Sequence, residues 1–135
     1  MNNEFVSYEI ALKLKELGFD ESCFGYYNID PALKTPPVNS SIPFNHEWCL
    51  SAPLFQQIFR YFREKFNWQA SIEATKDQHS RELGYNYWIW NSETGLEYHT
   101  MPMNCPSGDW EFKTYEDAEL ACLLKLIEII KNETE

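Results

Sequence analysis

Residues 51–66, SAPLFQQIFRYFREKF, carry the strongest periodic pattern in the chain. Phe55, Phe59, Phe62 and Phe66 recur at spacings of four, three and four residues, which is the spacing of one apolar stripe on an α-helix. Ser51 is a preferred N-cap residue, so the pattern predicts a helix that starts directly after it. We expect this helix to be the centre of the core, because each aromatic ring can bury on the order of 150–250 Å².

Two further helices flank this stretch in the sequence. Residues 7–17, SYEIALKLKEL, begin with Ser7 as a predicted N-cap and end before Gly18, which suits a left-handed C′ position. Thr114 is the predicted N-cap of the last helix, whose apolar residues cover two sides of its circumference. A helix of that kind must be covered on both sides, either inside the domain or by a second chain.

Three segments between the helices alternate in polarity like β-strands. Residues 68–75, 85–90 and 96–101 are separated by polar turns, and residues 109–112 suggest a short edge strand. The predicted fold is α+β: one domain, residues 1–135, with a three- or four-stranded antiparallel meander packed against helices. Residues 29–48 are expected to form a long irregular connection. The expected core residues are Phe55, Phe59, Phe62, Ile72, Leu124 and Ile127.

Composition narrows the range of partners. The chain has 135 residues and a formal net charge of −10, which disfavours binding to the phosphate backbone of bulk DNA or RNA. No apolar run approaches the ~18 residues of a membrane span, and the first residues do not resemble a basic signal-peptide n-region. We therefore expect a cytosolic protein without a membrane partner, whose four cysteines are reduced.

Catalytic and metal-binding patterns are weak in this sequence. His46 with Cys49, and His99 with Cys105, offer soft ligands, but their spacing is not that of a zinc site. No nucleophile elbow or glycine-rich phosphate loop is present. The sequence therefore predicts no catalytic residues, no metal and no cofactor, and a small hydrolase is only an alternative reading.

The strand 85–90 is the best candidate for a binding surface. It carries rings on both faces, with Tyr85 and Tyr87 on one face and Trp88 and Trp90 on the other, while its neighbour 68–75 has one polar face. One of the two ring pairs should therefore lie away from the core. Aromatic planes beside guanidinium groups are suited to stacking on a planar ligand, and the nearest arginines are Arg60, Arg63 and Arg81. The alternative is that these rings pack on the last helix or on a second copy, which fits an expected homo-oligomer.

Three blocks of the sequence resemble a known family. They are LKELGFDESCFGYYN at 14–28, SAPLFQQIFRYFREKFN at 51–67 and TYEDAELACLLKLIEIIKN at 114–132. Together they are similar to short uncharacterised proteins of phages, prophages and mobile elements of gut Bacteroides-type bacteria. The resemblance implies a non-enzymatic protein acting in the host cytosol, and it assigns no catalytic residues.

Two functions remain open on this basis. The first is sequestration of a small nucleotide-like signal of host defence, with rings stacking on a base and arginines meeting the phosphates. The second is an acidic interaction protein that occupies a basic groove of a host protein. Arginines gathered around the rings would favour the first, and arginines dispersed among carboxylates would favour the second.

Overall fold

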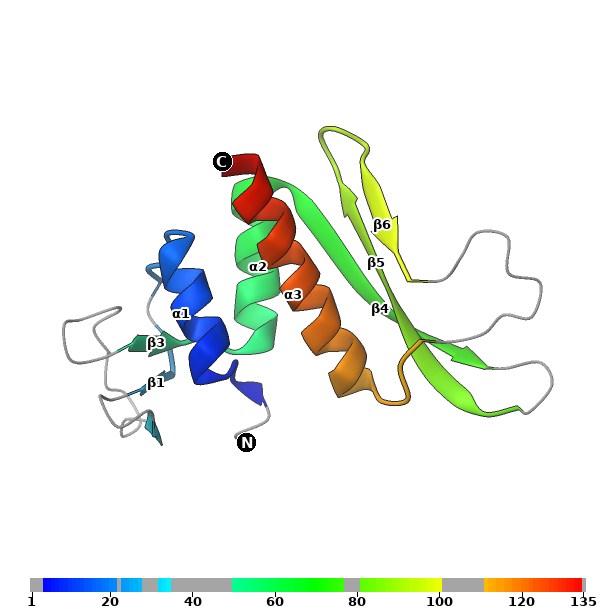
Figure 1. Ribbon diagram of the computed structural model, residues 1–135, viewed down its shortest axis with the longest axis horizontal. Coiled ribbons are helices and arrows are strands. Elements are labelled where there is room, and N and C mark those ends of the chain that lie inside the picture. Colours follow the sequence, from blue (N-terminus) through cyan, green and yellow to red (C-terminus); the bar gives the residue numbers. More distant parts are fainter. Residues whose placement is uncertain are drawn as a thin grey trace. The chain divides into compact units, whose positions relative to one another are not determined.

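The computed structural model describes residues 4–21, 23–27, 32–34, 50–76, 81–100 and 111–134. The chain divides into two compact units, which we call the N-terminal unit (Met1–Arg60 with Ile130–Glu135) and the sheet unit (Tyr61–Ile129). The elements are three α-helices and two antiparallel three-stranded sheets, so the fold is α+β as the sequence predicts (Figure 1). A single domain over residues 1–135 stays a prediction.

Helix α1, Tyr8–Glu16, begins and ends where the sequence predicts. The Oγ of Ser7 accepts a hydrogen bond from the Ile10 N–H at 3.4 Å, which satisfies one free donor of the first turn. At the other end Gly18 has φ +94°, the Gly18 N–H donates to the Lys15 carbonyl, and the Phe19 N–H donates to the Leu14 carbonyl. These two bonds form a Schellman motif, so local sequence alone is enough to delimit this helix.

The N-terminal unit also contains the sheet β2-β1-β3, made of β1 (Gly25–Tyr27), β2 (Leu33–Lys34) and β3 (Leu50–Ala52). Ser51 lies in β3 opposite Tyr26 and is buried, so the prediction that it caps the central helix is wrong. Ser51 belongs to a strand because the backbone of β3 forms hydrogen bonds with β1. The predicted irregular connection, residues 29–48, is described only at 32–34, where it includes β2; the rest lies outside the described residues.

Helix α2, Phe55–Phe66, starts three residues later than predicted. The Ile58 N–H donates to the Leu54 carbonyl, so Leu54 and not Ser51 occupies the N-cap position. Ile58, Tyr61 and Phe62 are buried, whereas Phe55 and Phe59 are only half-buried. The helix predicted from the phenylalanine spacing is present, but its buried face is rotated toward Ile58 and Tyr61.

The sheet β4-β5-β6 is the predicted meander. It consists of β4 (Trp68–Lys76), β5 (Leu83–Asn91) and β6 (Glu97–His99), each antiparallel to its neighbour. The fourth strand predicted at 109–112 is reduced, in its described part, to one bridge between Phe112 and Tyr85. Asp109 and Trp110 lie outside the described residues.

Two asparagines join α2 to this sheet. Asn67 has φ 64°, a left-handed conformation that ends the helix, and its carbonyl accepts hydrogen bonds from the N–H and Oγ of Ser92. The Nδ2 of Asn91 donates to the Phe66 carbonyl at 3.2 Å, and its Oδ1 accepts from the N–H groups of Glu93 and Thr94. The end of α2 and the β5–β6 turn therefore satisfy each other's backbone groups.

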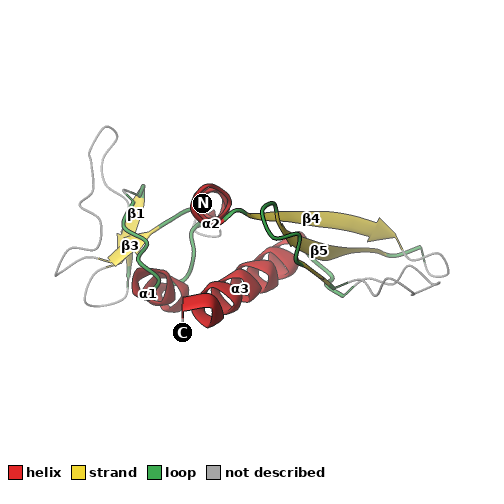
Figure 2. Ribbon diagram, turned by 90° about the horizontal axis from the view of Figure 1, so that it is seen from above, coloured by secondary structure: helices red, strands yellow, loops and turns green. Residues whose placement is uncertain are grey.

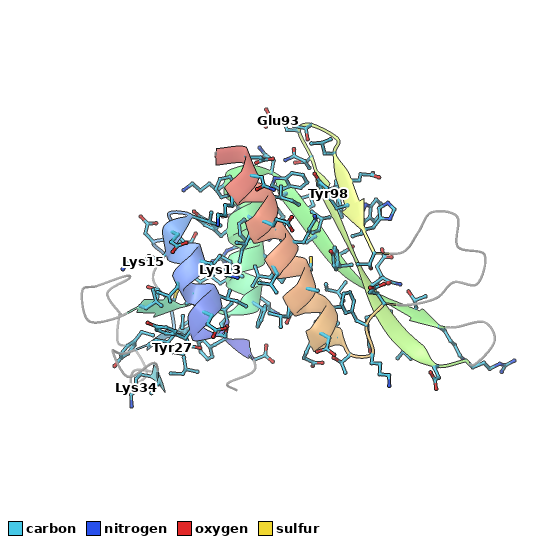
Figure 3. All side chains as sticks on the ribbon, in the orientation of Figure 1. Lys13, Lys15, Tyr27, Lys34, Glu93 and Tyr98 are labelled. Atoms are coloured by element: carbon cyan, nitrogen blue, oxygen red, sulfur yellow. The ribbon has the colours of Figure 1, made fainter. Side chains whose placement is uncertain are left out.

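Helix α3, Tyr115–Thr134, starts after Thr114, whose Oγ1 accepts from the Asp117 N–H as predicted. Over its length in the sheet unit, α3 lies on one side of the β4–β5–β6 sheet (Figure 2). Tyr98 lies between β6 and α3 (Figure 3); its ring is 6.0 Å from that of Trp68 and 5.0 Å from the Lys125 Nζ. This contact forms part of the packing between sheet and helix.

Four of the six expected core residues differ from the prediction: Phe55 and Phe59, described above, and two residues outside α2. Ile127 is buried, but Leu124 is 38% exposed and Ile72 is only half-buried. Leu120 is also 38% exposed, one turn before Leu124 on the same face of α3. The helix therefore turns its second apolar side partly to solvent, and its buried residues are Ala118, Cys122, Leu123, Leu126, Ile127, Ile129 and Ile130.

Candidate functional site

The two faces of the β4–β5–β6 sheet have different roles, because alternate side chains of a strand point to opposite faces. On β5, Tyr85 and Tyr87 point to the side of α3. The Tyr85 ring lies 5.9 Å from Tyr115 at 87°, and the Tyr87 ring is stacked on Phe112 at 6.1 Å and 23°. Burial raises the pKa of the Tyr87 hydroxyl. The two tyrosines are therefore packing residues, and Trp88 and Trp90 point to the other face.

Trp88 and Trp90 form a continuous aromatic patch on that other face. Their ring centroids are 4.9 Å apart at an interplanar angle of 41°, and Trp88 is 37% exposed. On β6, His99 lies opposite Trp88 with its ring edge-on at 6.5 Å, and Glu97 lies opposite Trp90. We call Trp88, Trp90, Glu97 and His99 the tryptophan surface. The sequence pattern predicts the tryptophan pair but misses Glu97 and His99, because their placement depends on the β5–β6 register.

The charges on this face are predominantly negative. Glu97 is exposed beside Trp90, and Glu73 lies on the same face of β4. Among the described residues of the three strands, alternation places no Lys or Arg side chain on this face. A cation that approaches the indoles therefore meets carboxylates, whereas an anion is repelled by them.

The predicted arginines lie elsewhere on the chain. Arg60 and Arg63 are exposed residues of α2, and Arg81 is exposed just before β5. In the described part of the chain, the amino groups seen over aromatic rings are those of Lys65 and Lys125, and no guanidinium group occupies such a position. The ligand-binding role of the three arginines stays a prediction.

A buried asparagine organises the far end of the same sheet face. Asn86 is 3% exposed; its Nδ2 donates to the Thr75 Oγ1 at 3.3 Å, and its Oδ1 accepts from the Thr100 Oγ1 at 2.9 Å and the Glu111 N–H at 3.1 Å. One side chain therefore links β4, β5 and the segments after β6 and before α3. Its signal in the sequence is a lone polar residue inside the aromatic run YNYWIW, a pattern that does not by itself indicate which groups the amide bonds.

One hydroxyl beneath the tryptophan surface has no partner. Ser71 lies opposite Trp88 in the β4–β5 ladder, and its buried Oγ makes no hydrogen bond. The Nε1 of Trp68, on the α3 face, is also buried without an acceptor. Each such group costs about 1–3 kcal/mol relative to a satisfied one. They are the two buried side-chain polar groups of the described residues that lack a bond.

The described thiols are poor nucleophiles. Burial raises the pKa of Cys122 to about 12, and burial likewise raises the pKa of Cys23 to about 12 despite hydrogen bonds from Ser51 and Gln57. His46, Cys49 and Cys105, which the sequence analysis considered as metal ligands, lie outside the described residues. Among the described residues, no group of three His, Cys, Asp or Glu side chains could hold a metal ion.

These two thiols give a measurable expectation. At pH 8, Cys23 and Cys122 should react with iodoacetamide far more slowly in the native protein than in urea, because the thiol and not the thiolate is present and is buried. Mass spectrometry of the labelled peptides measures both rates.

Because the folded pKa of about 12 exceeds the ordinary value of 9.0, the folded state keeps protons on these thiols that the unfolded state loses. Stability should therefore fall as the pH rises from about 9 to 12. Equal labelling rates in the native protein and in urea would contradict the burial of the two thiols on which both expectations rest.

In the described part of the chain, no helix is both long and apolar enough to cross a bilayer. Comparison of the chain with family models, with curated proteins and with solved structures finds no match in any of the three.

Proposed function

We propose that this chain is a non-enzymatic protein-binding module that takes a basic segment of a partner protein on the tryptophan surface. The observation that carries the proposal is the pairing of Trp88 and Trp90, 4.9 Å apart, with the Glu97 carboxylate on the neighbouring strand. A cytosolic location, in the host cell if the chain is phage-borne as its resemblance implies, is part of the proposal.

The physical basis is cation–π attraction combined with a nearby carboxylate. An Arg or Lys side chain over an exposed indole gains about 0.5–1 kcal/mol, and about 2 kcal/mol when it is desolvated. Cross-strand neighbours have Cβ atoms about 4.5–5.5 Å apart, so a cation over Trp90 is also within reach of Glu97. The net charge of −10 attracts a basic partner from a distance and speeds association.

A nucleotide-like ligand is the second candidate, favoured by the ring pair alone. Stacking of a base on an aromatic side chain is worth about 1–3 kcal/mol. Each unit of phosphate charge about 6 Å from a carboxylate costs about 0.7 kcal/mol even at the dielectric constant of water, and more near a protein surface. Because Glu73 and Glu97 share the face with the tryptophans, the repulsion is local, and a basic peptide fits this face better.

The test compares two probes on the same surface. An Arg- and Lys-rich 12-residue peptide and ATP are each titrated into ¹⁵N-labelled protein, and the indole N–H signals of Trp88 and Trp90 are followed. We expect the peptide to shift these signals. The variant Trp88→Ala/Trp90→Ala should weaken its binding at least about tenfold, which corresponds to about 1.4 kcal/mol. Glu97→Gln should weaken it less and reduce its dependence on salt.

Leu83→Ala is the matched control, since Leu83 is a 55% exposed apolar residue of the same strand. It should leave peptide binding unchanged. Shifts with ATP but not with the peptide would replace the proposal by the nucleotide candidate. Unfolding of the double variant, measured by circular dichroism, would show that the two rings serve the core.

A further inference from the structure

Strand β4 is an outer strand of the β4–β5–β6 sheet, and the backbone groups on the edge that pairs with no described strand can be assigned residue by residue. On β5, Tyr85 exchanges both backbone hydrogen bonds with Phe112, and the Tyr87 carbonyl accepts from the Thr100 N–H. The odd-numbered residues of β5 therefore direct their backbone N–H and C=O groups away from β4. The even-numbered residues form backbone hydrogen bonds with β4. Trp88 pairs with Ser71, so the odd residues of β4 face β5. The N–H and C=O groups directed to the open edge belong to Trp68, Ala70, Ile72, Ala74 and Lys76.

Strand β4 itself lacks the sequence features that keep edge strands apart. It is nine residues long, contains neither Pro nor Gly, and pairs one-to-one with β5 without a bulge. Its only lysine is the last residue, Lys76. Natural edge strands are usually short, bulged, covered or charged, because a row of free N–H and C=O groups pairs readily with another strand. In the described part of the chain, β4 has a partner on one side only.

We propose that β4 pairs with β4 of a second copy of this chain, antiparallel about a two-fold axis at Ile72. In this register Ala70 lies opposite Ala74 of the second copy, and each outward N–H meets an outward C=O. On the face of the tryptophan surface, Ser71 lies opposite Glu73 of the second copy. A carboxylate acceptor thereby reaches the position across from Ser71, whose Oγ has no partner within its own chain.

The charge distribution along β4 permits a second copy as the occupant. Two chains that each carry −10 repel one another over most of their surfaces. β4, however, contains one acid and one base, Glu73 and Lys76, and is therefore neutral. In the antiparallel register Glu73 faces Ser71, and Lys76 faces Trp68, so no like charges lie directly opposite. The two acidic chains can therefore meet at this neutral strand.

The pairing also has a consequence for the tryptophan surface. A two-fold axis perpendicular to the sheet keeps both copies of a face on the same side, giving the order β6-β5-β4-β4-β5-β6. Two β5 strands separated by three spacings of about 4.8 Å lie about 14 Å apart. The dimer thus presents two tryptophan surfaces on one six-stranded sheet, which suits a single extended basic segment or two linked ones.

The first experiment measures mass in solution by analytical ultracentrifugation. We expect the unmodified chain to show twice its 16.0 kDa mass. Ala74→Pro removes an outward N–H while leaving the β4–β5 ladder bonded, so this variant should be a monomer. Ala74→Ser keeps the N–H and should remain a dimer. A monomeric unmodified chain, or a dimer that persists in a folded Ala74→Pro variant, would overturn the proposal.

A disulfide test fixes the register and also covers the case in which Ala74→Pro does not fold. Positions 71 and 73 face each other across the two-fold axis as a non-hydrogen-bonded pair, about 4.5 Å apart between Cα atoms. The double variant Ser71→Cys/Glu73→Cys should therefore form a covalent dimer on oxidation. Glu73→Cys alone should not, because position 73 reaches its own copy only diagonally, at about 7–8 Å. No covalent dimer from the double variant, or an equal yield from the single one, would refute the register.

Discussion

Replacing Phe62 by Ala is expected to lower the free energy of unfolding by about 3–5 kcal/mol. Phe62 is fully buried, and its ring lies 5.8 Å from Tyr61 and 6.0 Å from Phe66. Truncation loses the transfer free energy of the ring and leaves a cavity. Domains of this size have total stabilities of about 5–15 kcal/mol, so the variant should be close to its unfolding threshold at 37 °C.

Phe59→Ala is the matched control. Phe59 belongs to the same predicted stripe but is only half-buried, so its truncation should cost about 1–2 kcal/mol. Urea unfolding followed by circular dichroism measures both values. If Phe59→Ala destabilises the protein more than Phe62→Ala, the buried face of α2 lies where the phenylalanine spacing alone places it, and the rotation toward Ile58 and Tyr61 is wrong.

Replacing Asn86 by Leu should lower the free energy of unfolding by about 2–4 kcal/mol. Leucine is close in size to asparagine, so packing is largely kept, but the hydrogen bonds to Thr75, Thr100 and Glu111 are lost. A buried group left without a partner costs about 1–3 kcal/mol. The lower end of that range applies to each bond here, because the partners are only partly buried. Amide exchange at Glu111 should also accelerate, since its N–H loses the Asn86 acceptor.

Thr75→Val is the control for Asn86, because it removes only the acceptor of the Asn86 Nδ2 and keeps the β-branched shape. It should cost about 1 kcal/mol. Chemical denaturation of both variants, together with hydrogen exchange at Glu111, separates the contribution of the Oδ1 atom from that of the amide nitrogen. A loss in Asn86→Leu no larger than in Thr75→Val would mean that the link to Thr100 and Glu111 contributes nothing to stability.

The choice between a nucleotide-like ligand and a basic peptide depends on the register of the β5–β6 pair. Trp88 and Trp90 suit a base or a cation equally well as rings. What distinguishes the two ligands is the position of Glu97, opposite Trp90 on β6. In sequence these residues are separated by a turn, and only the ladder shows that the carboxylate borders the indole. The net charge alone does not say where the negative charges lie. The register places one of them, Glu97, beside Trp90, and this position favours a basic partner.

The sequence by itself determines the local elements of this protein. Ser7, Gly18 and Thr114 delimit helices by hydrogen bonds within four residues, and the alternation at 68–75 identifies a strand with one polar face. Each of these depends on the residues nearby in the chain, so periodicity and capping preferences suffice to predict them.

Tertiary structure decides what depends on partners far along the chain. Ser51, a good cap in isolation, pairs with Tyr26 in a sheet, and α2 begins only after Leu54, so Ser51 does not occupy the N-cap position. Leu124 remains exposed although its own helix is strongly apolar, since no described neighbour covers that face. Which pair of rings becomes a surface follows from the side of the sheet on which α3 packs: Tyr85 and Tyr87 meet Tyr115 and Phe112, and the tryptophans lie on the opposite face, where Trp88 is exposed and Trp90 half-buried. Local preferences determine which residues form helices and strands. Long-range hydrogen bonding and burial determine which face of each element is buried.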